Sequence, residues 1–177
     1  MAAGAEARKR LGVEMSSTDE LLQNAARYAE AFDKGSLPAE PAKKVAVVTC
    51  MDARLLPARI LGLREGDAHV IRNAGGIVTA DTLRSLAISQ RVLGTEEVVV
   101  IQHTGCGMLG FDDGRFREQL ENETGTPPEW SAELSGDLQD NVREAVAQVR
   151  TSPFLAGTVS VRGFVYEVET GRLREVV

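Results

Sequence analysis

Five residues in two short segments bring together side chains that can bind a metal ion and orient water. The segment VVTCMDARLLPAR places Cys50, Asp52 and Arg54 at alternate positions, directly after a run of apolar residues. The segment HTGC places His103 and Cys106 three positions apart. Two thiolates and one imidazole are ligands that suit Zn²⁺, at bond lengths of about 2.0 to 2.3 Å. The two segments therefore predict a zinc site.

The number of available ligands indicates the kind of zinc site. The chain has only two cysteines, Cys50 and Cys106, and one histidine besides His103, which is His69. A closed structural site takes four Cys or His ligands, whereas three protein ligands leave a position for water, as in catalytic zinc sites. We interpret His69 as structural, because it lies inside an expected strand. The three remaining residues predict catalytic zinc.

Asp52 and Arg54 follow Cys50 closely enough to act on the same metal. In an extended exit from a strand, side chains at alternate positions point to the same side. An ordinary ion pair at a helix entry is the alternative interpretation. Beside a metal, a bidentate Arg54 would hold the Asp52 carboxylate away from the zinc and leave it free to accept a hydrogen bond from water. A released Asp52 would instead become a conditional fourth ligand in a closed state.

The elements that must position these residues alternate between strands and helices. This alternation predicts an α/β fold with a mainly parallel sheet, flanked by helices. Cys50 and His103 meet only if the first and third strands are neighbours, so we expect strand order 2-1-3-4, followed by an antiparallel C-terminal strand or hairpin that turns at Thr170 and Gly171. Ligands bind at such a switch point, outside the carboxyl ends of the strands. The expected strands are VAVVTC, AHVIRN, EVVVIQH and the segment beginning GTVSVRGFVY.

The ends of these strands also decide between zinc and a simpler interpretation. Taken singly, Cys50 and Cys106 could be buried apolar thiols and His103 a core histidine. The expected topology brings all three to one end of neighbouring strands, which favours zinc. The pair Gly75-Gly76 either lets backbone approach this site closely or forms a turn before the next helix.

An amphipathic helix precedes the first strand. Ser17-x-x-Glu20 has the form of a capping box, and apolar residues follow at helical spacing, which predicts a helix over residues 17–34. We expect residues 1–16 to form a disordered tail and residues 17–177 to form a single domain.

Composition excludes several function classes. The chain has 177 residues, 43% of them hydrophobic, and a formal net charge of −6, which argues against nucleic acid as a partner. No apolar run approaches the roughly 20 residues of a membrane-spanning helix, and the first residues lack the apolar segment of a secretion signal. We therefore expect a cytoplasmic protein that does not associate with membranes.

The combined pattern Cys50-x-Asp52-x-Arg54, His103-x-x-Cys106 and the intervening IRNAGG resembles the β-class carbonic anhydrases. The resemblance implies one zinc per subunit bound by both cysteines and the histidine, an Asp–Arg catalytic dyad, and reversible hydration of CO₂ to bicarbonate and a proton. It also implies a homodimer or homotetramer in which the N-terminal helix packs on the partner subunit.

Two alternatives to this function remain open, and a third motif match is weak. Relatives of the family hydrolyse carbonyl sulfide or carbon disulfide, so the substrate could differ while the chemistry stays the same. A non-catalytic zinc sensor would bind the metal without turnover. The glycines of GCGMLG match a dinucleotide fingerprint, but loop and helix signals follow them where the motif requires a βαβ unit.

Overall fold

The computed structural model divides into two compact units, Met1–Leu37 and Pro38–Val177. Residues 1–14 of the predicted tail lie outside the described residues, and a single domain over residues 17–177 stays a prediction. The structure describes residues 15–131, 134, 136–155 and 160–177.

Within residues 15–37, the described part of the first unit, the chain forms one helix, α2 (Ser17–Glu30). The predicted capping box from Ser17 is wrong by one residue, because Ser16 is the N-cap. The Ser16 hydroxyl accepts a hydrogen bond from the Asp19 backbone N–H at 3.2 Å, and the Asp19 carboxylate accepts one from the Ser16 N–H at 3.1 Å. The stretch SSTDE permits both registers, and a cap at Ser16 satisfies the N–H groups of Ser16 and Asp19.

Helix α2 ends earlier than predicted, at Glu30 rather than at residue 34. The N–H groups of Ala31 and Phe32 donate to the carbonyls of Tyr28 and Ala29, three residues back, which tightens and ends the helix. None of its residues is buried. The apolar residues that the pattern placed on one face are exposed, among them Leu21, Leu22, Tyr28 and Phe32.

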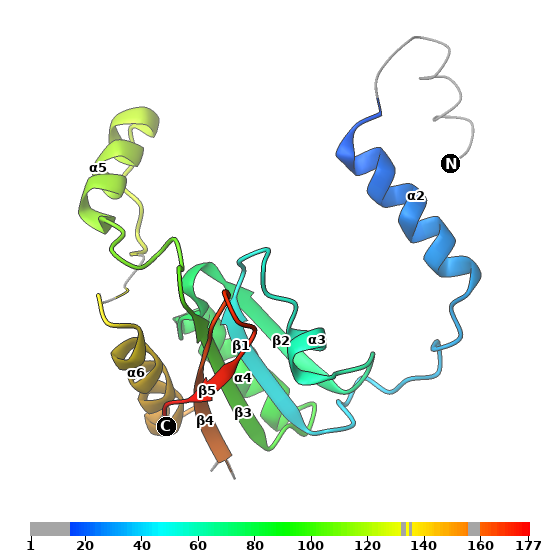
Figure 1. Ribbon diagram of the computed structural model, residues 1–177. Helices are drawn as coiled ribbons and strands as arrows, with labels where there is room; N and C mark the ends of the chain where they lie inside the picture. The colour runs from blue at the N-terminus through cyan, green and yellow to red at the C-terminus, as the bar shows by residue number, and fades with distance from the viewer. Residues whose placement is uncertain (1–14, 132–133, 135, 156–159) are drawn as a thin grey trace. The chain divides into compact units, whose positions relative to one another are not determined.

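The second unit is a five-stranded sheet with the order β2-β1-β3-β4-β5, which confirms the predicted order (Figure 1). The first four strands pair in parallel, and β5 pairs antiparallel with β4. The hairpin turn contains Gly171 with φ of 71°, as the Thr170-Gly171 signal predicted. The strands are β1 (Val45–Cys50), β2 (Ala68–Asn73), β3 (Glu97–His103), β4 (Ser160–Tyr166) and β5 (Leu173–Glu175).

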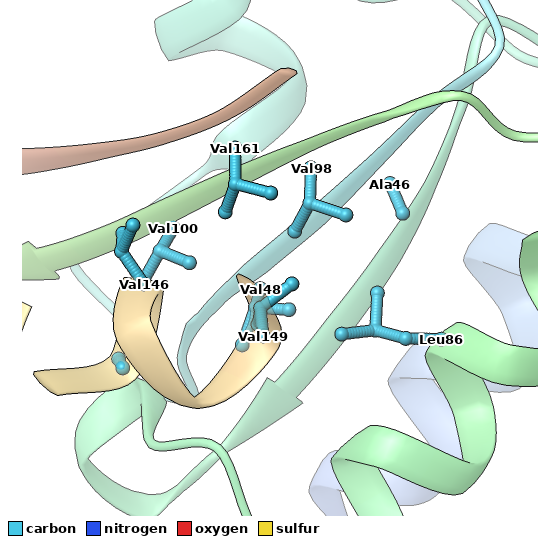
Figure 2. Close-up of a cluster of buried hydrophobic side chains, with 9 residues drawn as sticks. Ala46, Val48, Leu86, Val98, Val100, Val146, Val149 and Val161 are labelled. Atoms are coloured by element: carbon cyan, nitrogen blue, oxygen red, sulfur yellow. The ribbon is translucent and has the colours of Figure 1, made fainter. Parts of the chain in front are cut away.

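Two helices cover one face of this sheet and form the main core. Valines of the central strands pack against Leu86 of α4 and against Val146 and Val149 of α6 (Figure 2). Strands β1 and β3 are buried almost throughout, whereas β2 at the edge is only partly buried. The rigid centre of the sheet therefore ends where the predicted site begins. The helices of this unit are α3 (Pro57–Leu61), α4 (Ala80–Arg91), α5 (Asp113–Thr124) and α6 (Leu138–Thr151).

Gly76 brings a short 3₁₀ turn, η1 (Ala74–Gly76), into contact with the ends of the central strands. A Cβ at this position would lie 2.7 Å from the backbone nitrogen of Cys50 and 3.2 Å from the carbonyl oxygen of Ile101. The residue also has φ of 63°, in the left-handed region that favours glycine. Of the two roles predicted for the glycine pair, the close backbone approach is confirmed.

Replacing Gly76 with Ala is expected to lower the free energy of unfolding by about 3 kcal/mol or more, since overpacking and left-handed strain add. Gly62→Ala is the matched control. Gly62 has φ of 65° but no atom within 4 Å of its ideal Cβ, so it should lose only about 1 to 2 kcal/mol. Equal losses in urea unfolding would contradict the steric explanation.

Candidate metal centre

The three predicted metal ligands come together at the carboxyl edge of the sheet. Cys50 ends β1, His103 ends the neighbouring β3, and Cys106 lies in the turn that follows β3. Their ligand atoms all lie within 4.8 Å of one another. The topology therefore places these side chains together, as the sequence predicted.

The separation of the two sulfurs fits one tetrahedral metal ion. The Sγ atoms of Cys50 and Cys106 are 3.9 Å apart, and both cysteines are free thiols. Two sulfurs that each lie about 2.3 Å from a tetrahedral Zn²⁺ are separated by about 3.8 Å. The pair can therefore bind zinc without rearrangement of the backbone.

His103 is oriented by its own backbone. Its Nδ1 lies 2.9 Å from the carbonyl oxygen of Thr104, so Nδ1–H donates there and Nε2 keeps its lone pair. This Nε2 is buried and has no hydrogen-bond partner in the part of the chain that the structure describes. A buried imidazole nitrogen without a partner is costly, and a metal ion would satisfy it.

The two thiols have different acidities without a metal. Burial would raise the pKa of Cys50, but polar contact with the His103 ring and with the backbone of Asp52 and Gly75 lowers it from 9.0 to about 7. Burial, together with the negative charge of Cys50, raises the pKa of Cys106. One thiolate therefore forms readily and hinders the second, unless a cation lies between them.

Asp52 and Arg54 form a bidentate ion pair beside the three candidate ligands. Arg54 donates from Nε to Asp52 Oδ1 at 2.9 Å and from Nη2 to Oδ2 at 2.7 Å. These hydrogen bonds hold the pKa of Asp52 well below its usual range. The Oδ2 atom also lies 3.8 Å from His103 Nε2, so the carboxylate is held at the edge of the ligand set.

The arginine fork is anchored to the turn that bears Cys106. Arg54 Nη2 donates a second hydrogen bond, 2.8 Å long, to the carbonyl oxygen of Gly105. The Asp52 side chain is 19% exposed and that of Arg54 is 52% exposed. The dyad thus lies between the buried thiols and solvent, where it can control access to the ligands.

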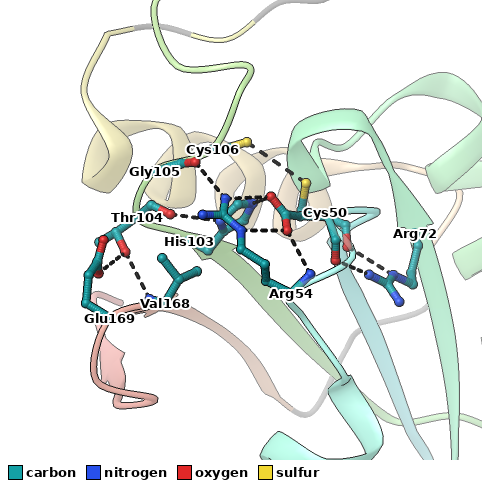
Figure 3. Close-up of polar contacts among 10 residues, drawn as sticks. Cys50, Arg54, Arg72, His103, Thr104, Gly105, Cys106, Val168 and Glu169 are labelled. Atoms are coloured by element: carbon teal, nitrogen blue, oxygen red, sulfur yellow. Dashed lines mark hydrogen bonds and ion pairs between the residues drawn. The ribbon is translucent and has the colours of Figure 1, made fainter.

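Arg72 on β2 is a supporting residue that the sequence interpretation missed. Its Nε donates to the Cys50 carbonyl at 3.0 Å and its Nη2 to the Asp52 carbonyl at 2.8 Å (Figure 3). These contacts fix the backbone where β1 ends. The IRNAGG motif contained this residue, but the sequence does not show that two carbonyls point at it.

Apolar side chains surround the two thiols. Cys50, Cys106 and fully buried Leu55 form a small cluster. Such surroundings strengthen electrostatic interactions within the site. The partly buried residues that pack against this cluster are Ile60, Met108, Leu109, Tyr166 and Val168.

His69 lies apart from the ligand group, as predicted. Its Nδ1 is 2.8 Å from the hydroxyl of Ser89, which in turn is 2.8 Å from the hydroxyl of Thr95. This hydrogen-bonded chain links β2 to the end of α4. His69 therefore has a structural role in the described residues.

Comparisons with known proteins agree on one family. The sequence model of the carbonic anhydrase family matches residues 45–126. A protein of Mycobacterium tuberculosis named beta-carbonic anhydrase 1 is 51% identical over 162 residues, covering 92% of this chain and 99% of that protein. A carbon disulfide hydrolase of Acidithiobacillus thiooxidans is 34% identical, covering 75% of this chain and 76% of that protein. The crystal structure of carbonic anhydrase from Streptococcus mutans superposes with a TM-score of 0.82 at 40% identity, covering 93% of this chain and 100% of that chain.

Proposed function

Because the chain belongs to the β-carbonic anhydrase family, and so catalyses the reversible hydration of CO₂ to bicarbonate and a proton, we propose that it uses one zinc ion per subunit held by Cys50, His103 and Cys106. The observation that carries the proposal is the meeting of these three ligand atoms within 4.8 Å. The sulfur separation and the unsatisfied Nε2 of His103 support it further.

Asp52 and Arg54 are the catalytic dyad in this proposal. Bound Zn²⁺ supplies a Lewis acid that makes water a nucleophile, an effect that two thiolate ligands weaken because they cancel its charge. Asp52 accepts a hydrogen bond from the attacking water and orients it toward CO₂. Arg54 holds Asp52 in place through the fork, and the released proton passes to solvent.

The same geometry supports a closed state in which Asp52 becomes a fourth ligand. The carboxylate lies next to His103, and it can turn to the metal only by leaving the Arg54 fork. Arg54 is therefore the residue that keeps the site open.

The activity is expected to increase from about pH 6 to about pH 9, because a zinc with two thiolate ligands acidifies water only moderately. Asp52 does not cause this rise. Hydrogen bonds from Arg54 lower the pKa of Asp52, so this carboxyl does not titrate in that pH range. The stabilisation of the fold by these hydrogen bonds is complete above the pKa of Asp52 in the unfolded chain, and it is lost only as the pH falls through the lower pKa of the folded protein. Stopped-flow measurement of kcat at fixed ionic strength tests this, and a flat profile would contradict it.

Carbon disulfide hydrolysis is a second candidate activity, because relatives with that name are 31 to 34% identical to this chain. Both substrates are linear and are attacked at carbon, so the shared ligand set does not discriminate between them. Parallel assays with CO₂ and CS₂ on the same zinc-loaded preparation give the preference as a ratio of kcat/KM. We expect this ratio to favour CO₂.

A homodimer or homotetramer is also part of the proposal. The apolar residues of α2 that lie exposed, such as Leu22 and Tyr28, supply a surface that a partner subunit can cover. A cytoplasmic location fits the two unpaired thiols, which reducing compartments preserve. Among the described residues, no helix is long and apolar enough to cross a membrane.

The decisive experiment compares zinc-loaded and metal-stripped protein in stopped-flow CO₂ hydration. We expect one zinc per subunit by elemental analysis, and activity that is lost with the metal and returns with it. Tightly bound zinc without turnover would identify a sensor instead.

A further inference from the structure

The turn between β4 and β5 lies against the turn that follows His103 and carries Cys106 (Figure 3). The Thr104 N–H donates to the Tyr166 carbonyl at 3.0 Å, and the Val168 N–H donates to the Thr104 hydroxyl at 3.0 Å. Tyr166 and Val168 also pack against the cysteine cluster. The C-terminal hairpin is therefore attached to the metal centre through Thr104.

Thr104 links a carboxylate of this hairpin to the site. Its hydroxyl donates to Glu169 Oε2 at 2.8 Å, while its carbonyl accepts the Nδ1–H of His103. The Thr104 hydrogen bond lowers the pKa of Glu169, with a further contribution from the positive charge of Arg54. Glu169 is therefore ionised at neutral pH, and its charge is held in one place.

This charge acts on Arg54. A Cβ at Gly105 would lie 3.7 Å from Arg54 Nη1 and 3.9 Å from Val168 Cγ2, so Arg54 and the hairpin residue next to Glu169 both lie beside Gly105. Asp52 makes the largest contribution to the raised pKa of Arg54, and Glu169 also contributes. Among the described residues Arg54 forms its close ion pair with Asp52, so Glu169 attracts it from beyond contact distance.

We infer that Glu169 is a positioning residue for catalysis: its carboxylate, fixed by the Thr104 hydroxyl, attracts the Arg54 guanidinium from the hairpin side and stabilises the fork on Asp52 and Gly105. The inference rests on the proposed role of the dyad. Glu169 touches none of the reacting atoms. Without its charge, Arg54 leaves the fork more often and Asp52 is released.

The first test measures Arg54 directly in zinc-free protein. The ¹⁵N order parameter of the Arg54 Nε–H bond should be lower in Glu169→Gln than in wild type, because the guanidinium leaves the fork more often. Glu167→Gln is the matched control, because Glu167 lies in the same turn but its carboxylate accepts from the Thr170 hydroxyl. An unchanged Arg54 signal in Glu169→Gln, or an equal change in the control, overturns the inference.

The second test measures coupling in zinc-loaded protein. Glu169→Gln should lower kcat/KM about two- to fivefold, the size expected for an exposed charge interaction. The same change made in an Arg54→Ala background should have no further effect, because its route of action is gone. An equal loss in both backgrounds would show a general structural role and overturn the inference.

A third comparison examines the hydrogen bond between the Thr104 hydroxyl and the Glu169 carboxylate. Thr104→Val keeps the side-chain shape but loses both hydroxyl hydrogen bonds, so it should reproduce the Glu169→Gln effect on the Arg54 order parameter, while Thr104→Ser should restore the wild-type value. If the Arg54 Nε–H order parameter in Thr104→Val equals that of wild type, the Thr104 hydroxyl does not act through Glu169 on Arg54. Because the Arg54 measurement needs neither zinc nor turnover, failure of the proposed enzymatic function would leave its outcome readable.

Discussion

Replacing Cys106 with Ser is expected to abolish stoichiometric zinc binding and to lower kcat/KM for CO₂ at least about 1,000-fold, since metal catalysis contributes several kcal/mol. The hydroxyl of serine does not ionise near neutral pH as a thiol does. Only Cys50 and His103 would remain as ligands, because the buried side chain at position 106 would no longer supply a thiolate. Elemental analysis and stopped-flow assays on the same preparation measure both effects.

The control for this change must alter a sulfur near the site without removing a ligand. Met108 packs against the cysteine cluster and is outside the ligand group, so Met108→Leu should keep zinc and most of the activity. A Cys106→Ser variant that retains one zinc and full turnover would exclude the proposed ligand set.

Metal binding should also raise the thermal stability of the protein. A ligand that binds only the folded state stabilises it by mass action, so zinc-loaded wild-type protein should melt at a higher temperature than metal-stripped protein. Cys106→Ser should melt close to the stripped wild type, with or without added zinc. This comparison separates loss of metal from damage to the fold.

The strand order could be predicted because the ligands restrict the topology. Cys50 and His103 bind one ion only if β1 and β3 are neighbours, and right-handed crossovers then place β2 outside β1. Cys106 follows from its short distance along the chain to His103. The proposed ligand set could therefore be predicted from two short sequence segments, together with the rule that the carboxyl ends of parallel strands meet at one edge of the sheet.

The supporting contacts could not be predicted in this way. Arg72 donates to two carbonyls, and Thr104 bonds to Glu169, which is 65 positions away in the chain. Backbone carbonyls carry no sequence signature, and the position of the β4–β5 turn over the site depends on the finished sheet. The pattern of α2 indicated an apolar face correctly but did not specify what covers it, and in the single chain that face is exposed.

Replacing Arg54 with Ala is expected to lower kcat/KM about 100- to 1,000-fold, although Arg54 is not a metal ligand. The change removes both side-chain hydrogen bonds of the fork and the one to Gly105, so Asp52 keeps only the hydrogen bond from the residue 54 backbone N–H to Oδ1, 2.9 Å long, and Oδ2 is released. Arg54→Lys keeps the charge without the fork geometry, and it should recover only part of the activity. Arg59→Ala, on the exposed side of α3, is the control and should retain activity.

A double variant distinguishes two ways in which Arg54 could act. If Arg54 only orients Asp52, then Asp52→Asn and Arg54→Ala should each lower activity, and thiocyanate should bind the zinc-loaded variants as it binds wild type. If Arg54 also holds Asp52 off the metal, Arg54→Ala should bind thiocyanate more weakly, and adding Asp52→Asn should restore that affinity because the amide is a poor ligand. We expect the second outcome, because Asp52 Oδ2 lies only 3.8 Å from His103 Nε2, and the ion pair with Arg54 holds the carboxylate in this position. Unchanged thiocyanate affinity in Arg54→Ala would exclude the gating role, whatever the activity of that variant.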